Sequence, residues 1–401
     1  MRILAFLAVV FAACAAQAQT LVRIAFIDPL SGPAAAVTQN GLNHFRFMAE
    51  RLSNERVRFE VTGFDNKLNP QETIVQAQKA IDAGIRIIAQ GNGSAAAGAL
   101  IDFIDKHNAR DPEHAAIYLN YAAGDPVLTN EKCSPYHFRF DAHSDMKMQA
   151  LTRFIAQRPE IRRVYLINQD YSFGRAARDA ARAMLAERRP DIEIVGDELH
   201  PLAKITDFSP YVAKIAASGA DSVITANWGT DLALLLKAAA DAHLQAGWYT
   251  YYASAIGSPT AIRQSGLAHR VFAVIEGHAN LRQIDRMEDE YRARYGGSVN
   301  VPRIRLLMEM LADAVAKAGG SDPLRIARAL SGATHRTMYG GLATMRAADH
   351  QVLQDFYIAS FGPLDATMHY DEEKTGWGWK TAGMIPAAAT ALPTTCRMAP
   401  L

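Results

Sequence analysis

The chain has 401 residues, 49% of them hydrophobic, with 42 Lys and Arg against 41 Asp and Glu. This length suffices for two lobes with separate cores, and the near-zero net charge argues against nucleic acid or an anionic membrane as a partner. Beyond the N-terminal run, no segment has the uninterrupted apolar length that a membrane-spanning helix needs.

The first eighteen residues have the form of a secretory signal peptide. Arg2 supplies a positive charge, an apolar run extends from Ile3 to Ala13, and Ala16-Gln17-Ala18 resembles a cleavage site. The run is too short to cross a bilayer permanently. We expect cleavage after Ala18, which places the mature chain outside the cytoplasm. A lipid-anchored start at Cys14 is the alternative.

Short apolar strands then alternate with longer amphipathic helices. Asp207 and Pro210 mark one helix start and Gly219 its end, and Pro302 and Pro323 start two further helices. The alternation predicts an α/β fold with parallel sheets covered by helices on both faces. It restarts near residue 160, which predicts two similar, doubly wound lobes. The expected strands are 21–27, 57–64, 85–89, 116–120, 164–168, 192–196, 222–226, 249–252 and 271–275, with helices at 71–83, 96–107, 175–187 and 232–242.

Two cysteines remain after the expected cleavage, Cys133 and Cys396. An even count in an oxidising compartment favours one disulfide, which would tie the C-terminal tail to the middle of the chain. Two separate buried thiols are the alternative.

The loop after strand 85–89 has the composition of an anion-binding turn. Its sequence is Gln90-Gly91-Asn92-Gly93-Ser94-Ala95-Ala96. Small residues let a ligand approach the backbone, and the helix that starts near Ser94 offers free N–H groups to a carboxylate at Ser94 and Ala95. Gly91, Gly93 and Ala96 also match a dinucleotide fingerprint, but the next strand ends in Asn120-Tyr121-Ala122, without an acid for a ribose. An ordinary glycine turn is the second alternative.

Aromatic and polar residues follow other strands at the same predicted edge. They are Tyr121, Tyr171 with Phe173, Trp228, and Ser254. Each ring alone could be packing between lobes, but together they indicate a concave site walled by both lobes.

Motifs of catalysis and metal binding are missing from the sequence. It contains no G-x-S-x-G, H-E-x-x-H or P-loop, and the spacing of His107 and His114 does not fit a metal site. We therefore expect a binding protein with no enzymatic activity, no cofactor and no metal.

The ordered set of these loops resembles the branched-chain amino-acid-binding family of periplasmic solute receptors. The resemblance runs from about Val22 to about Asp355. It implies a type I bilobed fold with three crossings of chain, and a monomeric periplasmic receptor that closes on a small solute and delivers it to the permease of an ABC transporter. The motifs that carry it are Ile24 to Pro33, Asp170-Tyr171-Ser172-Phe173-Gly174, Asp207-Phe208-Ser209 with Gly219-Ala220-Asp221, and Ala122 to Thr129 with Asp125-Pro126.

The resemblance also implies boundaries and site residues. We expect an N-terminal lobe of residues 19–140 plus 278–345 and a C-terminal lobe of 141–277 plus 346–369. Residues 370–401 are expected to pack as an extended strap over the surface. Carried over, the carboxylate cradle falls on Ser94 with its neighbours and on the loop Ala122–Gly124, and the aromatic wall on Tyr171, Phe173 and Trp228.

This chain departs from the family pattern at two positions. Amino-acid receptors usually place an acid near the loop after strand 249–252, where this chain has Ser254, and often have a hydroxyl residue where it has Gly124. Either Glu276 or Asp125 supplies the charge for an ammonium group, or the ligand has no amine.

Three interpretations of the function follow, two of which differ in the ligand. The first is a branched-chain amino acid or related small carboxylate. The second is a flat aromatic acid, such as a benzoate or cinnamate, stacked on Trp228, Phe173 and Tyr121. The third is a periplasmic ligand sensor.

Overall fold

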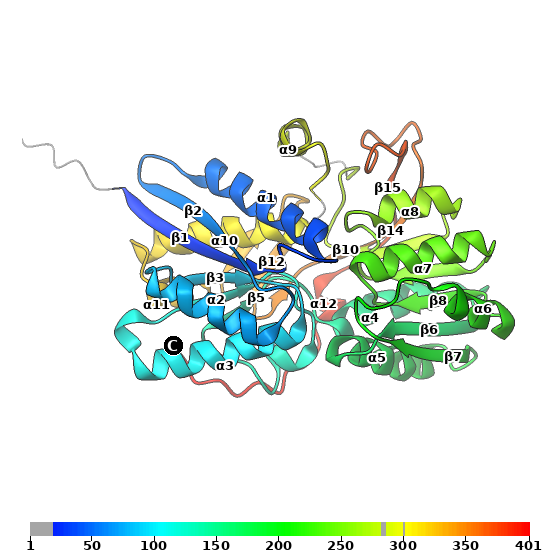
Figure 1. Ribbon diagram of the computed structural model, residues 1–401, viewed down its shortest axis with the longest axis horizontal. Helices are drawn as coiled ribbons and strands as arrows, with labels where there is room; N and C mark the ends of the chain where they lie inside the picture. The colour runs from blue at the N-terminus through cyan, green and yellow to red at the C-terminus, as the bar shows by residue number, and fades with distance from the viewer. Residues whose placement is uncertain (1–18, 282–285, 300) are drawn as a thin grey trace, which may run out of the picture.

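The computed structural model describes residues 19–281, 286–299 and 301–401. The expected signal peptide and Cys14 lie outside the described residues. Within them, the strands form a five-stranded, a seven-stranded and a three-stranded sheet. The two larger sheets belong to two lobes that lie side by side (Figure 1).

The first lobe is built on a parallel sheet of order β2-β1-β3-β4-β5. Helices α2 and α3 pack on one face through apolar residues such as Ala77 and Leu100, whereas α1 and α10 pack on the other through Phe45 and Leu307. Buried apolar runs in the central strands suit a sheet covered on both faces. The strands are β1 (Thr20–Asp28), β2 (Val57–Asp65), β3 (Ile87–Gln90), β4 (Ile117–Asn120) and β5 (His137–Arg139), and the helices are α1 (Ala35–Leu52), α2 (Pro70–Asp82), α3 (Ser94–Arg110), α9 (Met287–Tyr295), α10 (Pro302–Ala318) and α11 (Pro323–Leu330).

The second lobe is built on a sheet of order β15-β14-β10-β9-β8-β6-β7. The strands from β6 to β10 are parallel, and β14 and β15 join as an antiparallel edge. Helices α4 and α5 cover one face, and α6, α7 and α8 cover the other. The strands are β6 (Arg163–Gln169), β7 (Glu193–His200), β8 (Ser222–Thr225), β9 (Gly247–Thr250), β10 (Val271–Ile275), β14 (Phe356–Pro363) and β15 (Trp377–Ile385), and the helices are α4 (Ser144–Ile155), α5 (Ser172–Arg188), α6 (Ser209–Ser218), α7 (Gly229–Asp241) and α8 (Ser258–Ser265).

Up to β15, the described chain passes between the lobes at three places, and the C-terminal tail returns once more after it. These passages run from β5 to α4, from β10 to α9, and from β13 (Val352–Leu353) to β14. The small sheet of β11 (Thr334–Arg336), β12 (Leu342–Met345) and β13 packs on the first core through Ala343 and Met345. The two-lobed fold with three crossings therefore agrees with the expectation. Two short 3₁₀ turns, η1 (Pro112–His114) and η2 (Pro126–Thr129), complete the first lobe.

Each expected strand is confirmed, with ends that differ by a few residues. The largest consequence is at β9, which ends at Thr250 and leaves Tyr251 and Tyr252 in the loop that follows. The sequence pattern did not predict β5 or any strand from β11 to β15, nor helices α1, α4 and α8. The helix starts at Pro302 and Pro323 are confirmed, as is the end of α6 at Gly219, which has φ 66°.

The C-terminal segment differs from the expected strap. Residues 377–385 form β15, which pairs with β14 along its whole length. The physical reason is that Trp377 and Trp379 both pack against Phe361, with ring centroids 5.9 and 4.9 Å away. After α12 (Ala387–Thr390) the chain is extended and returns to the first lobe.

A disulfide ties this tail to the first lobe. Cys396 is bonded to Cys133, so the cysteine pairing predicted from the sequence is present. Thr394 and Thr395 also hydrogen-bond to Thr129 and Asn130 beside it. None of the described helices has the length and apolar character needed to cross a bilayer.

Candidate ligand-binding site

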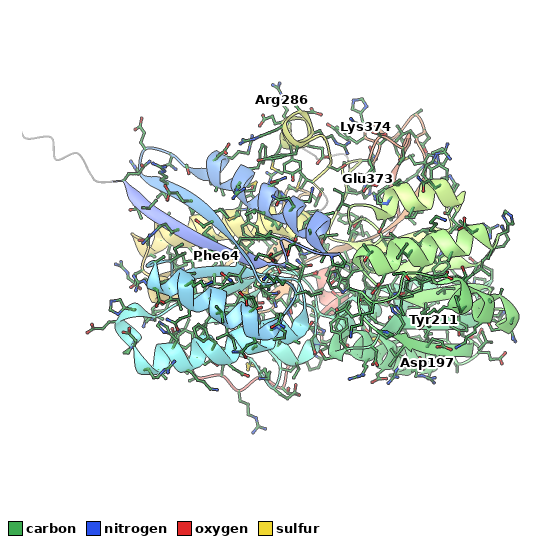
Figure 2. The ribbon with its side chains drawn as sticks, viewed as in Figure 1. Phe64, Asp197, Tyr211, Arg286, Glu373 and Lys374 are labelled. Atoms are coloured by element: carbon green, nitrogen blue, oxygen red, sulfur yellow. A yellow bond between two sulfur atoms is a disulfide. The ribbon has the colours of Figure 1, made fainter. Side chains whose placement is uncertain are left out.

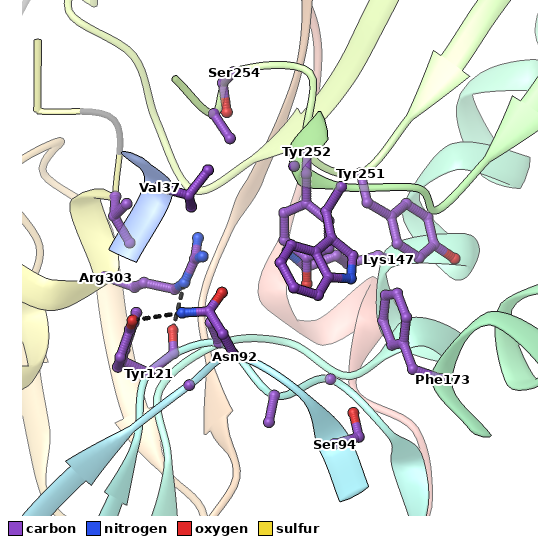
Figure 3. Close-up of a pocket in the computed structure, with 18 of the residues that line it drawn as sticks. Val37, Asn92, Ser94, Tyr121, Lys147, Phe173, Tyr251, Tyr252, Ser254 and Arg303 are labelled. Atoms are coloured by element: carbon purple, nitrogen blue, oxygen red, sulfur yellow. Dashed lines mark hydrogen bonds between the residues drawn. The ribbon is translucent and has the colours of Figure 1, made fainter. Parts of the chain in front are cut away.

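A pocket lies between the lobes, at the carboxyl ends of both parallel sheets (Figure 3). Such a position is where open α/β sheets bind small molecules. Of the site residues expected from the sequence, only Ala95 does not line it, because Ala95 is exposed on α3. The residues that the structure brings together there are Ser94, Tyr121, Ala122, Gly124, Tyr171, Phe173, Trp228 and Ser254.

The first-lobe side of the pocket contains the N-terminus of α3. Gly93 precedes the helix with φ 91°, a conformation that glycine adopts without strain, and Ser94 is the first helical residue. The first N–H groups of a helix have no partner within it and carry its positive dipole end. Ser94 is buried, and within the described chain its hydroxyl has no hydrogen-bond partner. This end of the pocket can therefore donate to an anion.

Asp28, which the sequence analysis did not single out as a site residue, holds the loop before α3 in place. Its buried carboxylate accepts hydrogen bonds from the Tyr121 hydroxyl at 2.5 Å and from the Asn92 N–H at 2.9 Å. Burial raises the pKa of Asp28 to about 7, although these hydrogen bonds oppose the shift. Asp28 stands at the carboxyl end of β1. Because the carboxyl ends of neighbouring parallel strands meet, this position could have identified Asp28 as a site residue from the sequence.

Tyr121 lines the pocket, but its main contacts are with the first-lobe core and with the loop before α3. Its ring stacks on Phe26 at 5.6 Å in the first core, and its hydroxyl bonds both Asp28 and Asn92. We expected this ring to stack on a ligand, but in the structure it packs against protein. The N–H groups of Ala122 and Ala123 are likewise occupied, because both donate to Asn120 Oδ1.

The second-lobe side of the pocket is an aromatic wall, formed by Tyr171, Phe173, Trp228, Tyr251 and Tyr252. Trp228 Nε1 donates to the Tyr171 hydroxyl at 2.9 Å, and the Phe173 ring lies 5.7 Å from that of Tyr171 and 6.1 Å from that of Tyr252. Tyr251 and Tyr252 were missed as site residues because the sequence pattern placed them inside a strand.

The two sides meet at Gly124. A Cβ atom at this position would lie 2.8 Å from Phe173 Cε2, which is closer than carbon atoms approach. Phe173 therefore occupies the space that a side chain at position 124 would fill. This contact gives a physical reason for the glycine.

A cluster of buried charges borders the pocket where the chain crosses between the lobes. Lys147 Nζ of α4 lies 2.8 Å from Asp141 and 3.7 Å from Glu276. Arg303 of α10 lies 3.3 Å from Glu276 and 3.4 Å from Asp141, and its Nε donates to the Tyr121 carbonyl at 2.5 Å (Figure 3). Lys147, Glu276 and Arg303 line the pocket, and Asp141 lies behind them.

Burial and pairing shift these groups in different directions. Burial raises the pKa of Glu276, although Arg303 and Lys147 oppose the shift. For Asp141, the two cations outweigh burial and hold the pKa below its usual range. Burial alone would lower the pKa of Arg303, but the carboxylates of Asp141 and Glu276 raise it. Of these four groups, the sequence analysis considered only Glu276, because no motif connects four separate elements.

Asp125, the other acid considered as a partner for an ammonium group, lies outside the pocket lining. Its carboxylate accepts from the Val127 N–H at 3.0 Å and begins η2. In the described part of the chain, no group of three or more His, Cys, Asp or Glu side chains is placed to hold a metal ion.

Comparisons with known proteins agree on one family. A family profile described as periplasmic binding protein matches residues 21–363. The Leu/Ile/Val-binding protein homolog 4 of Brucella melitensis is 32% identical over 357 residues, which cover 84% of this chain and 83% of that protein. The homolog 4 of Brucella suis has the same identity and coverage.

Solved structures show the same fold. The leucine-, isoleucine-, valine-, threonine- and alanine-binding protein from Brucella ovis, in a closed conformation, has a TM-score of 0.81 and 27% identity, covering 95% of this chain and 99% of that one. A solute-binding protein of an ABC transporter from R. palustris, in complex with 4-hydroxybenzoate, has a TM-score of 0.74 and 18% identity over 91% of this chain and 97% of its own.

Proposed function

The chain belongs to the periplasmic binding protein family, and on that premise we propose that it is the solute receptor of an ABC importer. Its ligand is a small carboxylate, of the branched-chain amino-acid type or a related acid, bound in the pocket between the lobes. The receptor works in the periplasm as a monomer, hands its ligand unchanged to membrane permease subunits, and has no enzymatic activity.

The observation that carries this proposal is the Ser94 hydroxyl at the N-terminus of α3, which has no hydrogen-bond partner among the described residues and faces the aromatic wall. A carboxylate at this point would accept from the hydroxyl and from free N–H groups of the helix. Its apolar body would then lie against Trp228, Tyr171 and Phe173. The names of the Brucella relatives support a branched-chain amino acid as the model ligand.

Transport requires two states of the receptor. In the proposed mechanism, one lobe comprises the five-stranded sheet with the small sheet of β11 to β13, and the other comprises the seven-stranded sheet that ends at β15. The boundary expected at residues 345 and 346 therefore moves to the connection between β13 and β14. Ligand contacts made by both lobes exist only when the lobes are closed, so the ligand increases the closed population. The permease then distinguishes closed from open receptor by the spacing of the two lobe surfaces.

A receptor for aromatic acids is the second candidate, because rings dominate the second-lobe side of the pocket. Flat acids stack favourably on such rings. Both candidates share the carboxylate end, so one experiment tests them together.

The test is isothermal titration with leucine, valine and benzoate, with small-angle scattering to detect compaction. Ser94→Ala should weaken carboxylate binding about 10- to 100-fold, because a hydrogen bond to a charged group is lost. Ser321→Ala, at an exposed position beyond the far end of α10, is the matched control and should change nothing. The ligand should be recovered unchanged by mass spectrometry. Conversion of the ligand would contradict the receptor role, and equal binding by Ser94→Ala would contradict the carboxylate site.

A further inference from the structure

The charges around the pocket distinguish among carboxylates. We infer that this pocket selects a carboxylate that carries no ammonium group, so that its preferred ligand is an organic acid and not a zwitterionic amino acid. The inference rests on the proposed function, because it concerns the ligand of that same site.

The first argument is the balance of charge. Among the described residues, the ionisable side chains other than tyrosine that line the pocket are Lys147, Glu276 and Arg303, two cations and one acid. The carboxylate of Glu276 lies within 3.7 Å of both cations. Asp141 behind it is paired with the same two, so the four groups neutralise one another. A bound monoanion adds its charge at the positive end of α3, whereas an ammonium would find no acid in excess.

The second argument concerns the positions from which an acid or hydroxyl could reach an ammonium. Ser254 is a neutral side chain on the loop after β9, on the opposite side of the pocket from Ser94 (Figure 3). Gly124 has no side chain, and Phe173 fills the space where a hydroxyl would stand. Asp125 is occupied at the start of η2.

The third argument concerns the rings, because aromatic faces also attract cations. The face of Tyr252 is already occupied, since Lys147 Nζ lies 4.3 Å from its ring centroid. The hydroxyl oxygen of Tyr171 accepts a hydrogen bond from Trp228 Nε1, so this contact is made within the aromatic wall. The aromatic wall is therefore suited to the apolar body of a ligand.

The experiment compares pairs of ligands that share a carbon skeleton and differ by the amine. Leucine is titrated against 4-methylpentanoate, and phenylalanine against 3-phenylpropanoate, into the full-length mature protein at pH 7.5. In each pair, we expect the acid without the amine to bind at least tenfold more tightly. If either amino acid binds as tightly as its partner or more so, the inference is overturned.

A second variant makes the test independent of the choice of skeleton. Ser254→Asp adds an acid to the pocket and should move the ratio of leucine to 4-methylpentanoate affinity at least tenfold toward leucine. Ser321→Asp adds the same charge at the exposed control position and should leave the ratio unchanged. Thermal melting of each variant confirms folding. A ratio that Ser254→Asp does not move would overturn the inference.

The failure of the inference differs from that of the proposed function. If amino acids bind tightly and compact the protein, the receptor role holds and only the selectivity is wrong. If no member of either pair binds and benzoate also fails, the proposed function fails and the inference with it.

Discussion

The two sides of the pocket differ in the chemistry of the groups that line them. The first-lobe side consists of loops whose polar groups mostly hydrogen-bond to Asp28 and Asn120. In the described part of the chain, the Ser94 hydroxyl and the first N–H groups of α3 have no such partner. The second-lobe side consists of rings, with Trp228 and Tyr171 bonded to each other. The carboxylate and the body of a ligand are thus served by separate lobes, and neither lobe alone forms the site.

Removing a ring from the second side should have the largest effect. Trp228→Ala should weaken ligand binding about 100-fold, or ~2.7 kcal/mol, because a large aromatic contact is lost. The melting temperature of the empty protein should change little, since Trp228 is partly exposed at the pocket. Titration calorimetry and thermal melting measure the two quantities.

Trp377→Ala is the matched control on the same lobe. Trp377 packs on Phe361, away from the pocket lining, so this variant should lower the melting temperature and keep its affinity. If Trp228→Ala instead mainly lowers the melting temperature, Trp228 is a core residue and the comparison of the two sides is wrong.

The contact where the two sides meet gives the next largest effect. Gly124→Ala puts a Cβ atom 2.8 Å from Phe173, so the ring must move and disturb the wall. We expect about tenfold weaker binding and a loss of about 1 to 2 kcal/mol in stability, as in other overpacked cores. Gly98→Ala is the control, because its nearest neighbour, in Leu128, is at 3.7 Å. Equal affinities for the two variants would contradict the tight contact.

A polar contact between the lobes outside the pocket should have the smallest effect. Glu372, on the connection from β14 to β15, hydrogen-bonds Ser298 and lies 3.7 Å from Arg292 of α9. Arg286, at the start of α9, and Glu373, beside Glu372, lie along the same edge of the molecule (Figure 2). Burial raises the pKa of Glu372 to about 8, above the ordinary value of 4.5, although Arg292 opposes the shift.

Because the pKa of Glu372 is higher in the folded state than in the unfolded state, binding of this proton stabilises the fold. The stabilisation is fully present below pH 4.5 and is lost as the pH rises toward 8. Residue 372 does not titrate in Glu372→Gln, so the variant does not lose this stability as the pH rises. The free energy of unfolding of Glu372→Gln minus that of the wild type should therefore increase by at least about 1 kcal/mol from pH 5 to pH 8. Urea unfolding at both pH values measures this difference. A difference that stays constant or shrinks with pH would exclude the raised pKa.

The sequence was sufficient for those parts of the site that depend on one strand and its following loop. Trp228, Phe173 and Ser94 follow strands whose apolar runs are clear, so their meeting at one edge could be predicted. Lys147 and Arg303 could not be found in this way, because each is one of several polar residues on an amphipathic helix and no local pattern distinguishes it. Their partners Asp141 and Glu276 lie on crossings whose paths only the tertiary fold defines.

The errors in the fold have similar causes. Tyr251 and Tyr252 extend the aromatic run of β9, and nothing local indicates that the strand ends at Thr250. The glycines between Trp377 and Ile385 weaken the strand pattern of β15, which depends instead on pairing with β14 and on packing against Phe361. Pairing between distant segments is what a single sequence conveys least.

The disulfide at Cys396 has a mechanical consequence for the hinge. The tail is anchored to the second lobe where Gln149 of α4 donates to the Ala389 carbonyl, and to the first lobe at Cys133. An extended chain from Ala389 to Cys396 reaches roughly 25 Å. While α12 stays on α4, this tether sets a ceiling on the opening amplitude of the receptor.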